Sequence, residues 1–188
     1  WIQLRKNPSD VIEKFFGIKL YENGGTLWAG PRTIIKSVFQ NRKTAVPSAH
    51  SMSKDWTAGL LAILWLIYHW PRAKVILTAP KMEQVKEIMF KEISVQYKTL
   101  CQRFSDFDPK ALTTKKLEFG PECFAIGLTN QDVSESDEKG TSKFQGFKSK
   151  NILIIVTEAQ DVSFSIYKQI KGLMTSPNAR LLEIGNPL

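Results

Sequence analysis

The chain alternates β-prone runs with longer stretches of helical spacing from residue 44 onward. Four runs have the length and composition of strands, at 44–47, 74–79, 151–157 and 179–184. Between them, apolar residues recur at helical intervals over 54–70, 81–104 and 162–174. The run at 151–157 is almost continuously apolar, which is typical of a strand covered on both faces. This alternation predicts an α/β domain with a mainly parallel sheet flanked by helices.

The other segments complete a single predicted domain over 1–188. Residues 1–40 form a helical lead-in: Asn7 and Pro8 begin a helix that stops at Gly17, and a second helix covers 31–40. A small β-hairpin insertion is predicted from 116–119 and 123–128. Turn-rich residues at 20–30 and a polar stretch at 129–143 predict loops.

Composition places the chain among ordinary globular proteins, with 43% apolar and 23% charged residues. Its most apolar stretch, 56–70, is shorter than the roughly 20 residues needed to span a bilayer, so it predicts a buried helix. Residues 1–17 mix charged and apolar positions, and no signal peptide is expected. Cys101 and Cys123 lack the spacing of a metal or redox site and are expected to be reduced thiols.

A formal net charge of +8 is the first indication of function. A basic domain tends to meet nucleic acid, anionic lipid or an acidic partner. The basic residues are spread along the chain, and a solvated surface with a basic bias explains the charge equally well. Aromatic residues do not interleave with them, which disfavours a base-stacking platform.

Ligands of parallel α/β sheets lie beyond the carboxyl ends of the strands, which selects the loops at 48–55, 157–161 and 185–187. In the first loop, Lys54 falls where the pattern GxxxxGK[ST] has its lysine. Such a loop directs backbone N–H groups, a helix N-terminus and one ammonium at phosphate. The predicted nucleotide-binding residues are Ser48, Ala49, His50, Ser51, Met52, Ser53, Lys54 and Asp55.

This loop departs from the pattern at three positions. Ser48 and Ser53 replace both glycines, and Asp55 stands where a hydroxyl residue is usual. Ser53 adds a Cβ where close backbone approach normally needs glycine. An ordinary capped helix start, with Asp55 in the first turn, is therefore an alternative interpretation.

Glu158 follows the apolar strand at 151–157, as the carboxylate of a Walker B motif does. A carboxylate at the end of a buried strand is costly unless it is solvated or paired. There it can orient or deprotonate the water that attacks the γ-phosphate, so Glu158 and Lys54 are the predicted catalytic residues. The alternative is that Glu158 only caps the helix that follows.

Over residues 27–188, these segments together resemble the ATPase domain of tailed-phage large terminase subunits, an ASCE-type P-loop NTPase. The order and spacing of several short segments carry the resemblance. They are Leu27-Trp28, Arg42-Lys43, Ala45 through Lys54, Thr78-Ala79-Pro80, Gln84-Val85, Phe144-Gln145-Gly146-Phe147, Glu158 through Val162, and Asn178 through Pro187.

The resemblance implies a motor that uses ATP and Mg²⁺ to package double-stranded viral DNA into the procapsid. Asn186 would sense the γ-phosphate, and the segment around it would couple hydrolysis to a subdomain movement. Implied partners are the portal protein, the small terminase subunit and further copies in a ring on the capsid, with a monomer when isolated. The implied location is the host cytoplasm, away from membrane. The lid and nuclease domains of relatives lie downstream and are expected to be absent from 1–188.

Two prolines mark further departures from the resemblance. Pro31 stands near the position of a glutamine that contacts adenine, and Pro47 stands where many relatives carry an arginine. The missing arginine implies one of two things. Either the enzyme is slow, because an arginine finger contributes about 10³–10⁵ in rate, or a neighbouring subunit supplies the cationic group. Lys143 and Lys148 are candidates for that group.

Asp55 and Thr157 are the predicted metal ligands. P-loop enzymes hold Mg²⁺ with a hydroxyl after the loop lysine and a carboxylate at the end of the Walker B strand. Here the carboxylate is Asp55 and the hydroxyl is Thr157, so the same two groups exchange places. We expect them to face each other across the metal. The alternative is a nucleotide- or DNA-binding P-loop module with impaired or absent hydrolysis. Another P-loop DNA motor, such as a helicase, would need motifs in a second α/β domain.

Overall fold

The computed structural model describes residues 7–19, 28–48, 53–129 and 146–186. A six-stranded sheet with the order β1-β6-β5-β2-β4-β3 forms its centre. The pairs β1/β6, β6/β5, β5/β2 and β2/β4 are parallel, and β3 pairs antiparallel with β4. The strands are β1 (Lys43–Pro47), β2 (Ala73–Thr78), β3 (Lys116–Gly120), β4 (Cys123–Leu128), β5 (Asn151–Val156) and β6 (Asn178–Gly185). The predicted α/β class with a mainly parallel sheet is confirmed.

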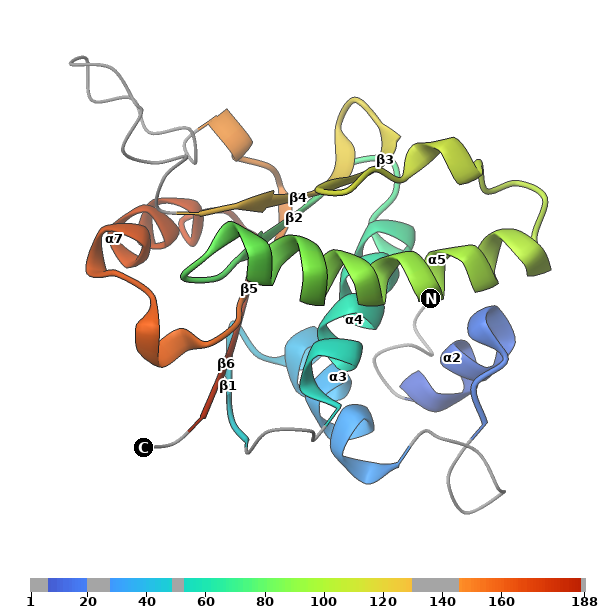
Figure 1. Ribbon diagram of the computed structural model, residues 1–188, viewed down its shortest axis with the longest axis horizontal. Helices are drawn as coiled ribbons and strands as arrows, with labels where there is room; N and C mark the ends of the chain where they lie inside the picture. Colours follow the sequence, from blue (N-terminus) through green and yellow to red (C-terminus); the bar gives the residue numbers. More distant parts are fainter. Residues whose placement is uncertain (1–6, 20–27, 49–52, 130–145, 187–188) are drawn as a thin grey trace.

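Helices cover both faces of the sheet (Figure 1). One face packs against most of them, while α7 covers the other face with a separate apolar cluster. The α-helices are α2 (Pro8–Phe16), α3 (Ala29–Gln40), α4 (Lys54–Tyr68), α5 (Lys91–Arg103) and α7 (Phe164–Leu173). A π-helix, η2 (Gln84–Phe90), precedes α5, and two 3₁₀ turns are η3 (Pro109–Ala111) and η5 (Ala159–Asp161).

The apolar runs in the sequence correspond to the most enclosed elements. Every residue of β2 is buried, and β5 is buried after its first residue. From Thr57 to Leu66, α4 is buried on all sides, because it lies between the sheet and α5. Among the described residues, no helix is both long and apolar enough to cross a membrane.

Helix boundaries follow local chemistry. Pro8 occupies the first turn of α2, and Gly17 ends it in the left-handed conformation with φ 68°. The predicted helix over 81–104 is instead η2 followed by α5. π-Helices are rare and occur mostly as short segments within α-helices, so a helical pattern alone predicts the α form.

The predicted hairpin forms, but it is part of the main sheet. β4 pairs in parallel with β2, which leaves β3 as the outermost strand. Predictions for 20–27, 130–145 and Pro187 lie outside the described residues, as does Lys143. Lys148, the other candidate for a cationic group, is exposed.

Candidate nucleotide-binding site

Three strand ends define the candidate site. β6 lies between β1 and β5, and all three run parallel, so their carboxyl ends meet at one edge. The register pairs Val156 with Glu183 and Pro47 with Gly185. Glu158 follows Val156 by two residues, as Gly185 follows Glu183, which places Glu158 beside the end of β6. The three loops selected from the sequence therefore converge.

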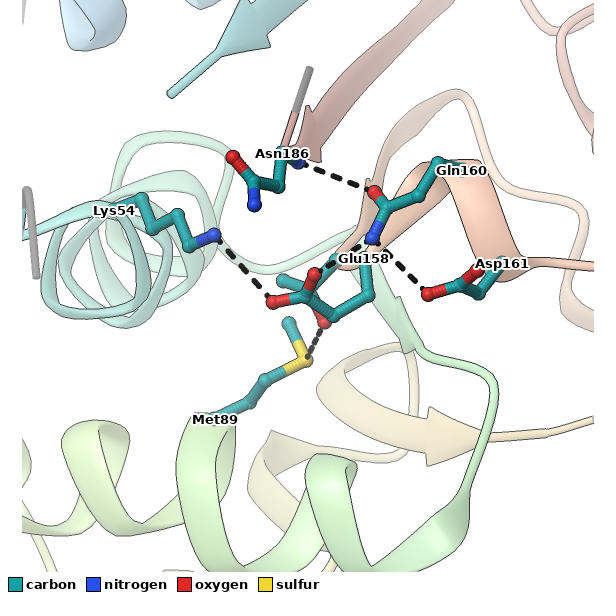
Figure 2. A network of polar contacts seen from close by, with 7 residues as sticks. Lys54, Met89, Glu158, Gln160, Asp161 and Asn186 are labelled. Carbon is teal, nitrogen blue, oxygen red and sulfur yellow. Dashed lines mark hydrogen bonds and ion pairs between the residues drawn. The ribbon is translucent and has the colours of Figure 1, made fainter. Parts of the chain in front are cut away.

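Lys54 and Glu158 form an ion pair at this edge (Figure 2). Lys54 Nζ lies 3.4 Å from Glu158 Oε1, with side chains 4% and 21% exposed. Lys54 opens α4, whereas Glu158 follows β5, so the pair joins two predicted loops. Within the described residues, Lys54 Nζ makes no hydrogen bond in addition to this ion pair. A buried ammonium with unused N–H donors is suited to bind phosphate oxygens.

Among the described residues of the site, Ser53, which precedes Lys54, and Glu158 itself have left-handed backbone conformations. Ser53 has φ 57° and ψ 21°, and Glu158 has φ 48° and ψ 49°. Residues with a Cβ rarely adopt this region, and each instance costs about 1–3 kcal/mol. Position 53 thus keeps the conformation for which a glycine is usual, although the residue is serine. At Glu158 the same conformation ends β5 and begins η5.

Replacing Ser53 with glycine is expected to raise the free energy of unfolding by about 1 kcal/mol. Removing the Cβ relieves the left-handed strain, and glycine's greater unfolded-state entropy offsets only part of that gain. The hydroxyl makes no capping hydrogen bond that would be lost. Urea denaturation measures the difference, with Ser53→Ala as the control, because alanine retains the Cβ. A glycine variant no more stable than the wild type would contradict this explanation.

The alternative interpretations, in which these two loops only cap the helices that follow, require capping hydrogen bonds from the side chains. Neither Ser53 nor Glu158 makes a side-chain capping hydrogen bond at the element it precedes. Glu158 instead places its two carboxylate oxygens toward Lys54 and Gln160. The hypothesis that Glu158 only caps the following helix is therefore wrong.

Gln160 belongs to the site although no sequence argument gave it a role. Its Nε2 donates to Glu158 Oε2 at 2.9 Å and to Asp161 Oδ2 at 3.1 Å. Its Oε1 accepts from the backbone N–H of Asn186 at 3.2 Å. In the sequence, Gln160 stands two residues after the Walker B carboxylate, within the segment Glu158 through Val162 that carries part of the resemblance. Its importance depends on β5 and β6 being neighbours.

The remaining predicted residues occupy the same edge or fall outside the described ranges. Asn186 follows β6, and Figure 2 shows its side chain directed toward Lys54 and Glu158. Ser48 follows β1 and donates its backbone N–H to Gly185 O at 2.9 Å. Ala49, His50, Ser51 and Met52 lie outside the described residues.

Comparisons with known proteins address the family. No family model matches the chain. The probable large terminase subunit of Enterobacteria phage P7 is 28% identical over 155 residues, which is 82% of this chain and 31% of that protein. The chain thus spans about a third of this curated relative. The large terminase ATPase domain of Thermus phage P74-26 superposes with a TM-score of 0.65 at 17% identity, over 96% of this chain and 70% of that one. The large terminase of bacteriophage HK97 superposes with a TM-score of 0.62 at 16% identity, over 96% of this chain and 37% of that one.

The resemblance to the ATPase domain of phage large terminase subunits is confirmed. At these identities the solved structures establish the fold alone. The roles of individual side chains in this terminase-like domain stay predictions, and the geometry supplies the grounds for them.

The two predicted metal ligands of the terminase-like domain differ in their surroundings. Asp55 is half-buried in the first turn of α4. Thr157 is 3% exposed, and its hydroxyl donates to Met89 Sδ in η2 at 3.5 Å. Across the described part of the chain, no three His, Cys, Asp or Glu side chains cluster to hold a metal. A role for Thr157 in metal binding, which stays a prediction, requires its hydroxyl to turn from Met89.

Tyr167 of α7 supports the turn after Glu158. Its hydroxyl donates to Ala159 O at 3.3 Å. Burial, together with the neighbouring Glu183 carboxylate, raises the pKa of Tyr167 to about 12. The phenol therefore remains a neutral donor throughout the neutral range, which keeps this contact with η5.

A cavity of about 500 Å³ lies between α3 and β1 and reaches the start of the phosphate loop. Trp28 and Ile34 line its α3 side, while Val46, Pro47 and Ser48 line its β1 side. The helix predicted over 31–40 begins two residues earlier, at Ala29, so Pro31 is buried in the first turn of α3 and is not its first residue.

Proposed function

We propose that this chain is the ATP-binding and ATP-hydrolysing motor domain of a large terminase subunit, which powers packaging of double-stranded viral DNA into a procapsid. The observation that carries the proposal is the Lys54–Glu158 pair at the carboxyl edge of a parallel sheet. It brings a phosphate-binding cation within contact of a carboxylate that can act on water. In this proposal, 1–188 is one ATPase domain with 1–40 as its lead-in.

The site has the parts needed for a nucleotide. Lys54 Nζ has unused N–H donors, and it stands at the N-terminus of α4, where the helix dipole favours negative charge. Phosphate bound there would lie beside Ser48, at the mouth of the cavity between α3 and β1. That cavity is large enough to receive a nucleoside.

In the proposed reaction, Lys54 and Glu158 exchange partners. Phosphate oxygens carry more negative charge than one carboxylate, so a bound triphosphate draws Lys54 Nζ away from Glu158 Oε1. Glu158 then holds the attacking water through its carboxylate and takes its proton as the water oxygen bonds to the γ-phosphorus. The bond between that phosphorus and the β,γ-bridging oxygen breaks at the same step, and ADP leaves with the bridging oxygen. Mg²⁺, when bound with ATP, neutralises charge on the phosphates. Asp55 and Thr157 have the carboxylate and hydroxyl that would hold it.

Exchanging Asp55 and Thr157 tests their proposed metal role. We expect Asp55→Thr alone and Thr157→Asp alone to lower Mg²⁺-dependent phosphate release, because each leaves two like ligands. The double variant restores one carboxylate and one hydroxyl in the usual order and should exceed both. Equal activity of the double variant and the better single variant would contradict the paired role. Mg²⁺ titration of each variant measures the effect.

A second candidate function is a nucleotide- or DNA-binding module with impaired hydrolysis. Two observations favour it: the Thr157 hydroxyl is directed at Met89, and Lys54 contacts the Glu158 carboxylate. ATP binding and phosphate release, measured side by side on the same preparation, distinguish the candidates. Binding without release leaves only the module, and release that requires Glu158 supports the motor.

The proposed partners follow from the packaging role. They are double-stranded DNA, the portal protein, the small terminase subunit and further copies of the chain in a ring, all in the host cytoplasm. The net charge of +8 supports a polyanionic partner. DNA binding by the chain should weaken linearly in log–log plots as salt rises, because bound phosphates release counterions. Salt-independent binding would count against this role.

A further inference from the structure

One side chain joins the proposed base to the end of β6. Gln160 donates to Glu158 Oε2 at 2.9 Å and accepts from the Asn186 backbone N–H at 3.2 Å. The two partners are far apart in the sequence and lie on different strand ends. Figure 2 shows the Gln160 amide between them, with Lys54 on the other side of the Glu158 carboxylate.

The chemistry of the partners fixes the orientation of the Gln160 amide. Ionised Glu158 and Asp161 only accept hydrogen bonds, whereas the Asn186 backbone N–H only donates. All three contacts form only when Nε2 faces the carboxylates and Oε1 faces Asn186. An acid or an alkyl side chain at position 160 cannot make this combination. The contacts therefore require an amide.

Because Gly185, the last residue of β6, has no side chain, Gln160 can approach the strand closely. A Cβ built on Gly185 would lie 2.7 Å from Gln160 Oε1, closer than side-chain atoms pack. Gln160 is exposed, so burial does not explain its position. The close approach to Gly185 and the hydrogen bond from the Asn186 N–H are two separate observations that place the amide against the end of β6.

Hydrogen bonds and one ion pair connect the two ends of the phosphate loop through the end of β6. Ser48, at the start of the loop, donates its backbone N–H to Gly185 O at 2.9 Å. From there the connection continues through Asn186, Gln160 and Glu158 to Lys54 at the other end of the loop. A change at the Lys54–Glu158 pair therefore has a direct path to the segment after β6.

We propose that Gln160 is a positioning residue that transmits the state of Glu158 to the segment beginning at Asn186. The proposal rests on the proposed function. When a triphosphate takes Lys54 from Glu158, the carboxylate moves to the attacking water. Gln160 Nε2 follows the carboxylate, and Oε1 releases the Asn186 N–H. Nucleotide binding thereby loosens the end of β6, which is where hydrolysis would be coupled to movement.

Hydrogen exchange of the Asn186 amide, followed by NMR with and without ATP, tests this link together with kcat and ATP affinity. In the wild type, ATP should speed exchange at Asn186. Gln160→Ala should give fast exchange in both states, with kcat lowered about 10-fold and affinity changed less than about threefold. Gln102→Ala, an exposed glutamine on α5, is the matched control and should behave as wild type.

Two further variants separate a coupling role from a structural one. Gly185→Ala retains every polar group but should displace the amide, so it should reproduce Gln160→Ala. Gln160→Glu keeps an acceptor for Asn186 and loses the donor to Glu158. It should keep slow exchange without ATP and lose the response to ATP.

The outcomes distinguish the coupling from the function on which it rests. A wild-type chain that binds no ATP overturns both. A chain that hydrolyses ATP while Gln160→Ala retains the wild-type kcat and the wild-type response at Asn186 overturns the coupling alone. Loss of the response in Gln160→Ala and Gln160→Glu, with affinity preserved, supports it.

Discussion

Replacing Lys54 by methionine is expected to weaken ATP binding about 10- to 150-fold and to abolish phosphate release. The methionine keeps most of the buried stem but removes the ammonium, and hydrogen bonds to charged groups contribute about 1.5–3 kcal/mol each. Isothermal titration with ATP measures the change in affinity. Any residual binding would come from the loop backbone and from the cavity between α3 and β1.

Lys74 provides a matched control for Lys54. It is also a buried lysine in an ion pair, with Nζ 3.4 Å from Glu122 Oε2 and a side chain 8% exposed. Lys74 lies at the opposite end of the sheet, near the start of β2. Lys74→Met should therefore lose an ion pair without losing ATP affinity. Equal losses in the two variants would show that the Lys54 effect reflects damage to the fold.

Glu158→Gln is expected to reduce phosphate release about 10²- to 10⁴-fold while leaving ATP binding intact or tighter. The amide cannot take a proton from water, and general-base catalysis contributes about that factor. Binding does not suffer, because the amide no longer competes with phosphate for Lys54 Nζ. Phosphate release under saturating ATP measures the effect.

The exposed Glu122 provides the control for Glu158. Glu122→Gln removes a carboxylate from a lysine pair of the same length, at the far end of the sheet. It should leave both binding and release unchanged. If Glu158→Gln releases phosphate at the wild-type rate, Glu158 is not the base.

The sequence predicted the architecture because burial leaves a local record. β2 and β5 are covered on both faces, so their runs are apolar throughout, and α4 is apolar because it is enclosed on all sides. Strand order leaves no such record. The place of β6 between β1 and β5 is set by packing between distant segments, and no spacing in the sequence encodes it.

Ser53 shows that a residue name alone does not give the backbone conformation. A serine in place of glycine favours impaired phosphate binding by this loop, and that interpretation stays a prediction. In the structure its backbone adopts a left-handed conformation, which glycine adopts more readily than serine. The cost is local strain, whereas the direction of the chain into α4 is preserved. The residue type sets the free-energy cost of a backbone conformation, whereas the surrounding packing decides whether the chain adopts it.

Gln160 shows the opposite case, because the sequence indicates no role for it and it lies at the centre of the site. Its contacts to Glu158 are local, but its contact to Asn186 spans 26 positions and exists only because β5 and β6 are paired. Thr157 also has a contact that the sequence does not indicate. Its position at a strand end predicts a metal ligand, whereas its hydroxyl donates to Met89 in a π-helix that the apolar pattern does not distinguish from an α-helix.

Single-turnover hydrolysis of γ-labelled ATP, with protein in excess and Mg²⁺ present, tests the central claim most directly. Excess protein reveals a slow reaction that steady-state assays miss, which matters because Pro47, the last residue of β1, stands where the resemblance predicts an arginine. We expect the wild-type chain to release labelled phosphate and Glu158→Gln to retain bound, uncleaved ATP. Bound ATP that the wild type cleaves no faster than Glu158→Gln would contradict the assignment of Lys54 and Glu158 as an ATPase site.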